Sequence, residues 1–214
     1  SSLNLEKYDE WKDDPDMIGD VMRFLDNVLS DFINKAPEQF KDAKYSAERE
    51  RSVGLGVMGF HSFLQQKRIP LESVMAKSWN KKIFKNIHEK VNQASKDLAE
   101  ERGACPDAAE YGFKERFSNK TAIAPTASIS IICGGTSPGV EPIAANSFTH
   151  KTLSGSFNVR NKYLRQLLEK HGKDTDEVWS SITTNQGSVS HLHFLTQEEK
   201  DVFKTAFELD QRWL

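Results

Sequence analysis

The sequence predicts a helix-rich α/β fold in which short strands lie between longer helices. In residues 17–33 and 73–102, apolar side chains recur at spacings of three and four, which is typical of amphipathic helices. Short apolar runs bounded by proline or glycine, such as residues 121–124, indicate buried strands. The sequence contains no internal repeat and no low-complexity tract, so a repeat architecture is not expected.

Composition excludes several classes of partner. The 214 residues are 37% hydrophobic and 28% charged, and the net charge of −2 provides no electrostatic footprint for nucleic acid or an anionic membrane. No apolar run approaches the roughly 20 residues of a membrane span, and no signal peptide is visible. The only cysteines, Cys105 and Cys133, are too few for a disulfide framework and favour a reducing compartment. We therefore expect a cytoplasmic protein with no nucleic-acid and no membrane partner.

In the first half of the chain we expect one short strand and three helices. Residues 1–5 alternate weakly, as a strand does, and a polar stretch follows. Asp16 is expected to cap a helix over residues 17–33 whose buried stripe consists of Ile18, Val21, Leu25, Leu29 and Phe32. Ser46 is expected to cap a second helix that carries residues 51–66. The third helix is expected to begin at Ser73 and to end near Arg102, before Gly103.

Three glycines in residues 51–66 match the pattern G-x-G-x-x-G. Gly54, Gly56 and Gly59 would suit a dinucleotide-binding fingerprint, but that motif must follow a strand and here follows the charged run at residues 48–51. Each glycine costs a helix about 1 kcal/mol, which a close contact must offset. We therefore interpret the glycines as a place where two backbones pack closely.

In the second half of the chain we expect short elements. They are, in order, a short helix or irregular segment at residues 107–120, a strand at 121–124 that Pro125 ends, a hairpin or a strand with a bulge at 148–159 around residues 154–156, helices at 161–171 and 174–181, and a last helix capped by Thr196.

Several isolated side chains have a chemical and a structural interpretation, and the structural one is favoured. His191 and His193 lie on one side of an extended chain, but no acidic or cysteine partner stands at ligand spacing, so we expect no metal. Glu141 could be catalytic, although a structural hydrogen bond to backbone is commoner. His88 is expected to be a surface or packing residue, and Cys105 to be inert.

The residues after Pro125 predict an anion-binding turn. Thr126, Ala127 and Ser128 are small, two of them carry hydroxyls, and they begin a helical turn. The first N–H groups of a helix have no partner inside it and carry partial positive charge, which suits a phosphate. Spacing alone leaves open the alternative that Thr126 or Ser128 is simply an N-cap.

Four segments resemble the large, catalytic subunit of class I ribonucleotide reductase, in the order of that family. They look like the strand after a redox cysteine, the glycine-bearing helix, the substrate-phosphate loop and the segment after it. The segments are SSLNL (1–5), RSVGLGVMGFHSFL (51–64), APTASISIICGGTSPGVEP (124–142) and THKTLSGSFNVRNKYL (149–164). Together they extend over nearly the whole chain.

The resemblance implies a partial ten-stranded α/β barrel, of which residues 1–214 would be the C-terminal part, as a single partial domain. Enzymes of this family reduce ribonucleoside diphosphates to deoxyribonucleotides by radical chemistry. In the family, the turn that matches Thr126, Ala127, Ser128 and Ile129 holds the substrate diphosphate. The implied partners are the remaining N-terminal part of the large subunit and a separate, metal-containing small subunit that generates the radical.

The family's radical machinery has no counterpart in this chain. Its thiyl-radical cysteine, the nearby asparagine and glutamate, and both redox cysteines are missing, and one redox cysteine would fall just before Ser1. Cys133 stands where relatives carry an apolar residue. The family's effector-binding module and its C-terminal tyrosine pair and cysteine tail also have no counterpart. We expect no catalytic residue, metal or cofactor in this chain, and no reductase activity from the chain alone.

The two ends of the sequence suggest a piece of something longer. The chain begins at Ser1 without a methionine and stops at Leu214 inside a helical pattern. It would suit a split large subunit whose other part docks along open barrel strands, an extein piece for which Ser1 is the splicing nucleophile, or a simple fragment. The alternative function is a non-catalytic interaction or assembly module that completes the large subunit.

Overall fold

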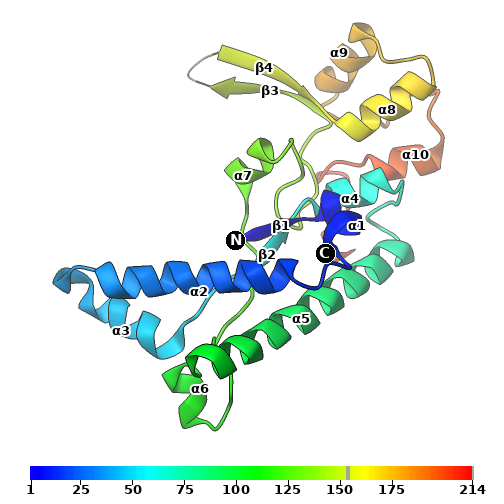
Figure 1. The fold of residues 1–214 in the computed structure, drawn as a ribbon. Helices are drawn as coiled ribbons and strands as arrows, with labels where there is room; N and C mark the ends of the chain where they lie inside the picture. The colour runs from blue at the N-terminus through cyan, green and yellow to red at the C-terminus, as the bar shows by residue number, and fades with distance from the viewer. Residues whose placement is uncertain (153–154, 214) are drawn as a thin grey trace. The chain divides into compact units, whose positions relative to one another are not determined.

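The computed structural model describes residues 1–152 and 155–213, which form two compact units. Unit 1 comprises residues 1–57 and 79–124, and unit 2 comprises residues 58–78 and 125–214. Figure 1 shows the elements of both units along the chain. No helix in the described ranges is long and apolar enough to cross a membrane.

The elements of unit 1 are mainly helices. They are β1 (Ser2–Asn4), η1 (Leu5–Lys7), α1 (Tyr8–Trp11), α2 (Met17–Lys35), η2 (Glu38–Phe40), α3 (Lys41–Glu50), β2 (Gly56–Met58), α5 (Val74–Arg102) and α6 (Pro106–Glu110), with β2 ending and α5 beginning in unit 2. The predicted strand at residues 1–5 is confirmed, and β1 pairs with β2. The described strands form two-stranded sheets only, so the ten-stranded barrel stays a prediction.

Helix α2 buries a face that differs from the predicted stripe. The buried side chains are Ile18, Met22, Asp26 and Ile33. Of the predicted stripe, only Ile18 is fully buried, and Phe32 is 40% exposed. The predicted stripe was therefore wrong. The buried face is rotated about the helix axis from the predicted one, because a charged residue, Asp26, lies at its centre.

The capping residue of α2 was also predicted wrongly. Asp16 stands at the N-cap position but makes no capping hydrogen bond through its side chain. Instead, Oδ1 of Asp14 accepts hydrogen bonds from the backbone N–H groups of Asp16 and Met17, at 2.9 and 3.1 Å. An acidic side chain still provides the cap, but it belongs to Asp14, two residues before the expected Asp16.

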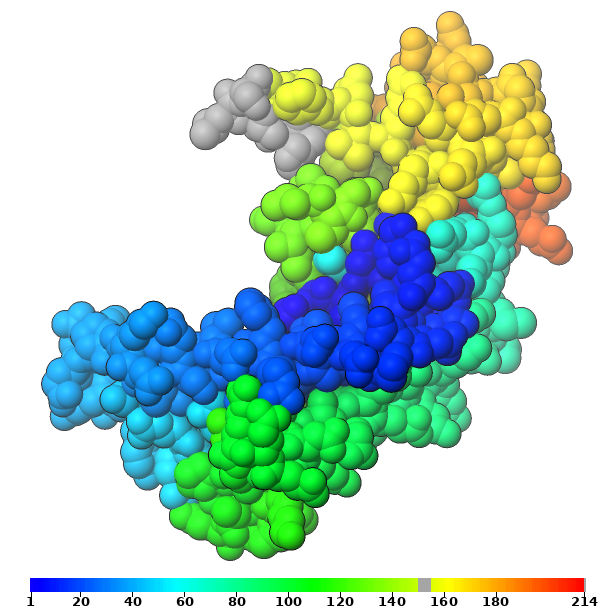
Figure 2. Space-filling view, viewed as in Figure 1, coloured from blue at the N-terminus to red at the C-terminus, as the bar shows by residue number. Residues whose placement is uncertain are grey.

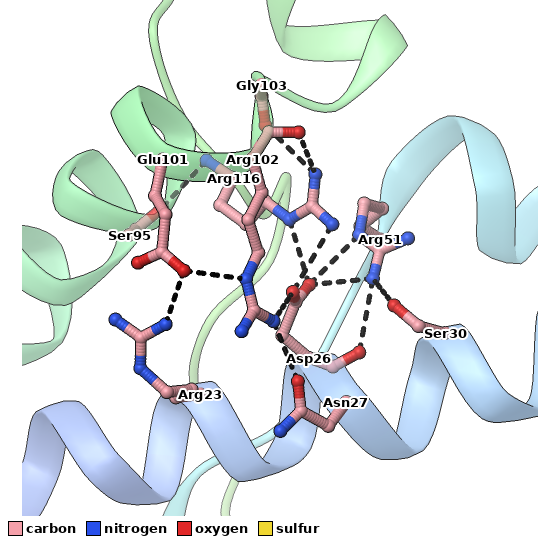
Figure 3. A network of polar contacts seen from close by, with 10 residues as sticks. All are labelled: Arg23, Asp26, Asn27, Ser30, Arg51, Ser95, Glu101, Arg102, Gly103 and Arg116. Atoms are coloured by element: carbon pink, nitrogen blue, oxygen red, sulfur yellow. Dashed lines mark hydrogen bonds and ion pairs between the residues drawn. The ribbon is translucent and has the colours of Figure 1, made fainter.

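Asp26 is fully buried and is neutralised by three arginines. Figure 3 shows their guanidinium groups converging on its carboxylate. Arg51 Nη2 donates to Oδ1 at 2.7 Å, Arg102 Nη1 to Oδ2 at 2.9 Å, and Arg116 Nε to Oδ1 at 2.9 Å. Burial alone would raise the pKa of Asp26, but the hydrogen bonds from Arg116, Arg51 and Arg102 outweigh it and lower this pKa. The network joins α2 to the ends of α3 and α5 inside unit 1.

The long helix α5 confirms the third predicted helix. Oγ of Ser73 accepts a hydrogen bond from the N–H of Ala76 at 3.1 Å, and Gly103 ends the helix with a positive φ of 87°. The predicted seam faces the core of unit 1, with Ile83, Ile87, Val91, Ala94 and Leu98 buried and Trp79 partly buried.

Residues 51–66 do not form one helix, contrary to the prediction. Helix α3 ends at Glu50, β2 follows, and α4 (Phe60–Gln66) begins only after Gly59, whose φ is 84°. A side chain at Gly56 would place its Cβ 2.1 Å from the carbonyl oxygen of Ala122. Close backbone packing at a glycine is thus confirmed, but Gly56 lies in a strand rather than in the predicted helix. This long-range contact favours extended backbone over helix.

The predicted strand at residues 121–124 is reduced to a single bridge. Leu55 and Thr121 form an isolated parallel bridge, in which the N–H of Ala122 donates to the carbonyl of Leu55 at 3.2 Å. The segment has no second strand neighbour among the described residues, and its side chains are exposed rather than buried as predicted.

Unit 2 contains the other elements, which confirm the predicted order. They are α4, α7 (Ala127–Ile132), β3 (Ser147–Thr152), β4 (Gly155–Arg160), α8 (Lys162–Lys170), α9 (Asp176–Thr184), α10 (Gln197–Val202) and η3 (Gln211–Trp213). Strands β3 and β4 pair antiparallel, with Ser147 opposite Arg160, and the start of the predicted turn at Ser154 lies outside the described residues. Thr196 caps α10 in a capping box with Glu199.

The core of unit 2 is a cluster of apolar side chains from α8, α9, α10 and the segments between them. Its largest member, Trp179, is 1% exposed. Asn161 caps α8 by accepting hydrogen bonds from the N–H groups of Tyr163 and Leu164. The buried residues are Tyr163, Leu164, Leu167, Leu168, Trp179, Ile182, Val189, Leu192, Leu195, Val202 and Phe203.

Candidate functional site

The predicted anion-binding turn lies at the start of α7 in unit 2. Thr126 immediately precedes the helix and has φ 52° and ψ 26°, which is the left-handed region. A β-branched residue rarely adopts this conformation, because its Cβ then crowds the backbone. Such strain persists only where neighbouring contacts hold the residue, and it concentrates at functional sites. Sequence reasoning gave no sign of it.

The side chain of Thr126 does not cap the helix. It is buried, and its Oγ1 accepts a hydrogen bond from the N–H of Gly139 at 2.7 Å. Ser128 lies within the first turn of α7 and is exposed. Thr126 therefore occupies the N-cap position of α7 without capping it through its side chain, and Ser128 is not the N-cap.

The first turn of α7 carries backbone donors on exposed residues. The first intrahelical bond runs from the N–H of Ser130 to the carbonyl of Thr126 at 2.9 Å. The N–H groups of Ala127, Ser128 and Ile129 therefore have no partner inside the helix, and all three residues are exposed. This segment, light green in Figure 2, lies at the surface of unit 2. The geometry allows an anion to contact these donors.

The loop after α7 is fixed on a buried polar face of α4. Ser62 and Ser137 exchange hydrogen bonds: each hydroxyl accepts from the other residue's backbone N–H, at 2.8 and 3.1 Å. The N–H of Ile143 donates to Nδ1 of His61 at 3.1 Å. His61 and Ser62 are 1% and 5% exposed. Sequence reasoning missed both residues, although polar residues within the apolar stretch GFHSFL were the available signal.

His61 is uncharged in the folded protein. Burial lowers the pKa of its imidazole from 6.5 to about 4. Because Nδ1 accepts a hydrogen bond, the proton of the neutral ring lies on Nε2. The ring therefore acts as a fixed acceptor for the loop at neutral pH.

The other candidates take structural positions. His191 Nε2 lies 3.0 Å from Ser181 Oγ, and burial, followed by the charges of His193 and Lys200, lowers the pKa of His191. The described residues contain no group of three or more side chains that could hold a metal ion. Glu141 is exposed, and its backbone N–H donates to the carbonyl of Pro138.

The two cysteines and His88 also have defined surroundings. Cys105 is fully buried beside the start of α6, and Cys133 is exposed at the end of α7. His88 is exposed and lies within hydrogen-bond distance of Asn92. Cys105 belongs to unit 1 and Cys133 belongs to unit 2.

The whole chain matches the family model described as the barrel domain of ribonucleotide reductase, in two overlapping segments over residues 1–116 and 107–214. The chain therefore belongs to this family, and the resemblance found in the sequence is confirmed.

Its relatives include large subunits of ribonucleoside-diphosphate reductase. The chain is 50% identical to the large subunit from Invertebrate iridescent virus 6, over 100% of this chain and 22% of the relative. It is 35% identical to the vitamin B12-dependent reductase of Thermoplasma acidophilum, over 99% and 28%. The class Id ribonucleotide reductase alpha subunit of Actinobacillus ureae has a TM-score of 0.89 and 41% identity, over 99% and 39%. The chain thus spans about a fifth to two fifths of the length of these relatives.

Proposed function

We propose that this chain is the C-terminal part of the ten-stranded catalytic barrel of a ribonucleoside-diphosphate reductase large subunit. In this proposal, units 1 and 2 belong to one partial domain, and the enzyme reduces ribonucleoside diphosphates to deoxyribonucleoside diphosphates. The observation that carries the proposal is the turn Thr126–Ala127–Ser128–Ile129, with its exposed backbone donors at a strained helix start.

The four residues of the turn have different roles in this proposal. The N–H groups of Ala127, Ser128 and Ile129 and the hydroxyl of Ser128 donate to the diphosphate, and the helix start adds partial positive charge. Thr126 sets the direction of these donors, because its side chain is held by Gly139. The role of the turn is to position the substrate, so that the ribose is presented to catalytic groups elsewhere in the enzyme.

The radical and the reducing thiols come from outside this chain in the proposal. The remaining part of the large subunit supplies the redox and thiyl cysteines, and a separate metal-containing small subunit supplies the radical. Some relatives are named vitamin B12-dependent. The identity of the radical source is therefore a more specific claim of this proposal than the identity of the substrate. We further propose a cytoplasmic location.

The proposal is tested by placing a negative charge in the turn. In the complete large subunit, assembled with its small subunit, Ser128→Asp should repel the diphosphate and raise the KM for CDP by about 10-fold or more. Ser128→Ala should raise it less, because only one donor is lost. Ser180→Asp, on the exposed surface of α9, is the control and should leave KM unchanged. An unchanged KM in Ser128→Asp would refute diphosphate binding at this turn.

A second candidate function is an assembly module without its own substrate contact. It is favoured by exposed apolar side chains on α7, where Ile131 and Ile132 are 55% and 82% exposed. Unit 1 also has an apolar groove beside α5, lined by residues such as Leu55, Phe84 and Ile123 and bordered by lysines. Large apolar surfaces of this kind mark places where another chain packs. Normal assembly of Ser128→Asp with unchanged KM would support this function.

A further inference from the structure

The loop at residues 136–139 is held against α4 by a reciprocal pair of serines. Ser137 N–H donates to Ser62 Oγ at 2.8 Å, and Ser62 N–H donates to Ser137 Oγ at 3.1 Å. The N–H of Gly59 donates to the carbonyl of Ser137 at 2.8 Å. Ser62 and Ser137 are 5% and 1% exposed, so water has little access to replace these bonds.

The same loop holds the strained residue of the turn. Two residues after Ser137, the N–H of Gly139 donates to Thr126 Oγ1 at 2.7 Å. At the other end of the loop, the N–H of Thr136 donates to the carbonyl of Ser130 in α7 at 3.1 Å. A threonine at φ 52° requires such contacts to keep its conformation. The contacts therefore form a continuous path within unit 2, from Ser62 through the loop to Thr126.

We propose that Ser62 and Ser137 are positioning residues for the diphosphate turn. Neither touches substrate; they fix the loop whose Gly139 amide fixes Thr126, and so set the direction of the N–H groups of residues 127–129. This inference rests on the proposed function of the turn. Loss of the Ser62 hydroxyl leaves the N–H of Ser137 buried without an acceptor, which displaces the loop.

The kinetic signature follows from the position of the turn. The diphosphate does not react, so contacts to it hold substrate and transition state alike, and their loss raises KM more than it lowers kcat. In the complete large subunit assembled with its small subunit, Ser62→Ala should raise the KM for CDP about 10-fold and change kcat less than about 3-fold. Ser62→Thr keeps the hydroxyl and should restore most of the affinity.

A matched control separates positioning from general destabilisation. Ser95 in unit 1 is also fully buried, and its Oγ accepts the backbone N–H of Arg116 at 3.1 Å. Ser95→Ala should lower the melting temperature, as Ser62→Ala does, but leave KM unchanged. A double variant tests the route: when Thr126→Val has already removed the Gly139 contact, adding Ser62→Ala should raise KM no further.

The results distinguish this inference from the proposed function. If Ser62→Ala leaves KM unchanged while Ser128→Asp raises it, the positioning role is wrong and the diphosphate turn stands. If Ser62→Ala raises KM equally in the presence and absence of Thr126→Val, the route through Gly139 is wrong. If neither Ser62→Ala nor Ser128→Asp changes KM, both proposals fail. Should Ser62→Ala not fold, Ser62→Cys fills the same space with a weaker acceptor, and an unchanged KM in that variant overturns the inference.

Discussion

Asp26 shows, at the scale of single residues, how a charge becomes part of a core. Removing its charge removes the carboxylate that Arg51, Arg102 and Arg116 share, although Arg102 keeps an ion pair with Glu101 at 3.2 Å. We expect Asp26→Asn to lower the free energy of unfolding by about 3–5 kcal/mol, the usual effect of breaking a buried ion pair. Urea titration followed by tryptophan fluorescence measures it.

The control for Asp26 lies on the same helix. Asp31 pairs with Lys35, and both side chains are more than half exposed, so Asp31→Asn should unfold close to the parent midpoint. Equal midpoints for Asp26→Asn and Asp31→Asn would show that the arginine network does not stabilise unit 1.

His61 gives the protein a pH-dependent stability. Its folded pKa of about 4 lies below the ordinary 6.5, so the unfolded chain binds the proton first as pH falls. The contribution is complete above pH 6.5 and is lost between pH 6.5 and 4, by about 3 kcal/mol in total. His61→Asn keeps an acceptor for the Ile143 N–H but does not titrate in this range.

The measurement is the difference in unfolding free energy between the parent and His61→Asn at pH 7 and at pH 4. This difference should shrink as the pH falls, because only the parent loses stability through this group. The exposed His88 provides the control, and His88→Asn should follow the parent curve. A difference that does not change with pH would contradict a buried, neutral His61.

Residue-scale features were the hardest to predict from the sequence. Apolar periodicity wrongly predicted that Val21 and Leu25 lie on the buried face of α2. A sequence pattern does not reveal that Asp26 accepts a hydrogen bond from Arg116, 90 positions away. The strain at Thr126 likewise depends on Gly139. The start of a helix after Pro125 was predicted correctly, since its signal is local: a proline followed by small residues.

At the scale of elements, the extended conformation within residues 51–66 depends on one glycine. A Cβ at Gly56 would lie 2.1 Å from the Ala122 carbonyl oxygen, so Gly56→Ala must push residues 121–123 away from β2. We expect a loss of about 1–3 kcal/mol in unfolding free energy, as for overpacked cores. The comparison is Gly19→Ala in α2, where a Cβ meets nothing within 4 Å and helix propensity should add about 0.5–1 kcal/mol.

Opposite signs for the two glycine variants in one urea series would confirm the close approach of the two backbones. A stable Gly56→Ala would contradict it.

The same contact explains which elements the sequence predicted well. Helices α5 and α8 have their own caps and apolar seams, and α10 has a capping box, so local pattern sufficed. Strand β2 required knowledge of Ala122, which no local pattern contains.

At the scale of the whole molecule, the order of the sequence motifs predicted the family, whereas apolar periodicity did not predict a barrel. The described strands pair only as β1 with β2 and β3 with β4. In the proposed barrel, exposed segments such as residues 121–124 would need strand neighbours, and another stretch of chain would supply their hydrogen-bonding partners. The sequence of this chain alone therefore predicts the helices better than the sheet.

We expect this chain to have no reductase activity by itself. In the proposed function, the redox thiols come from the remaining part of the large subunit, and Cys105 of this chain is fully buried. The purified chain should therefore form no dCDP from CDP when supplied with the small subunit and a dithiol reductant. Adding the remaining part of the large subunit should restore product formation, and a chain carrying Ser128→Asp should restore it only at raised CDP concentrations. Formation of dCDP by the chain and small subunit alone would show that the reducing groups lie within residues 1–214, contrary to the proposal.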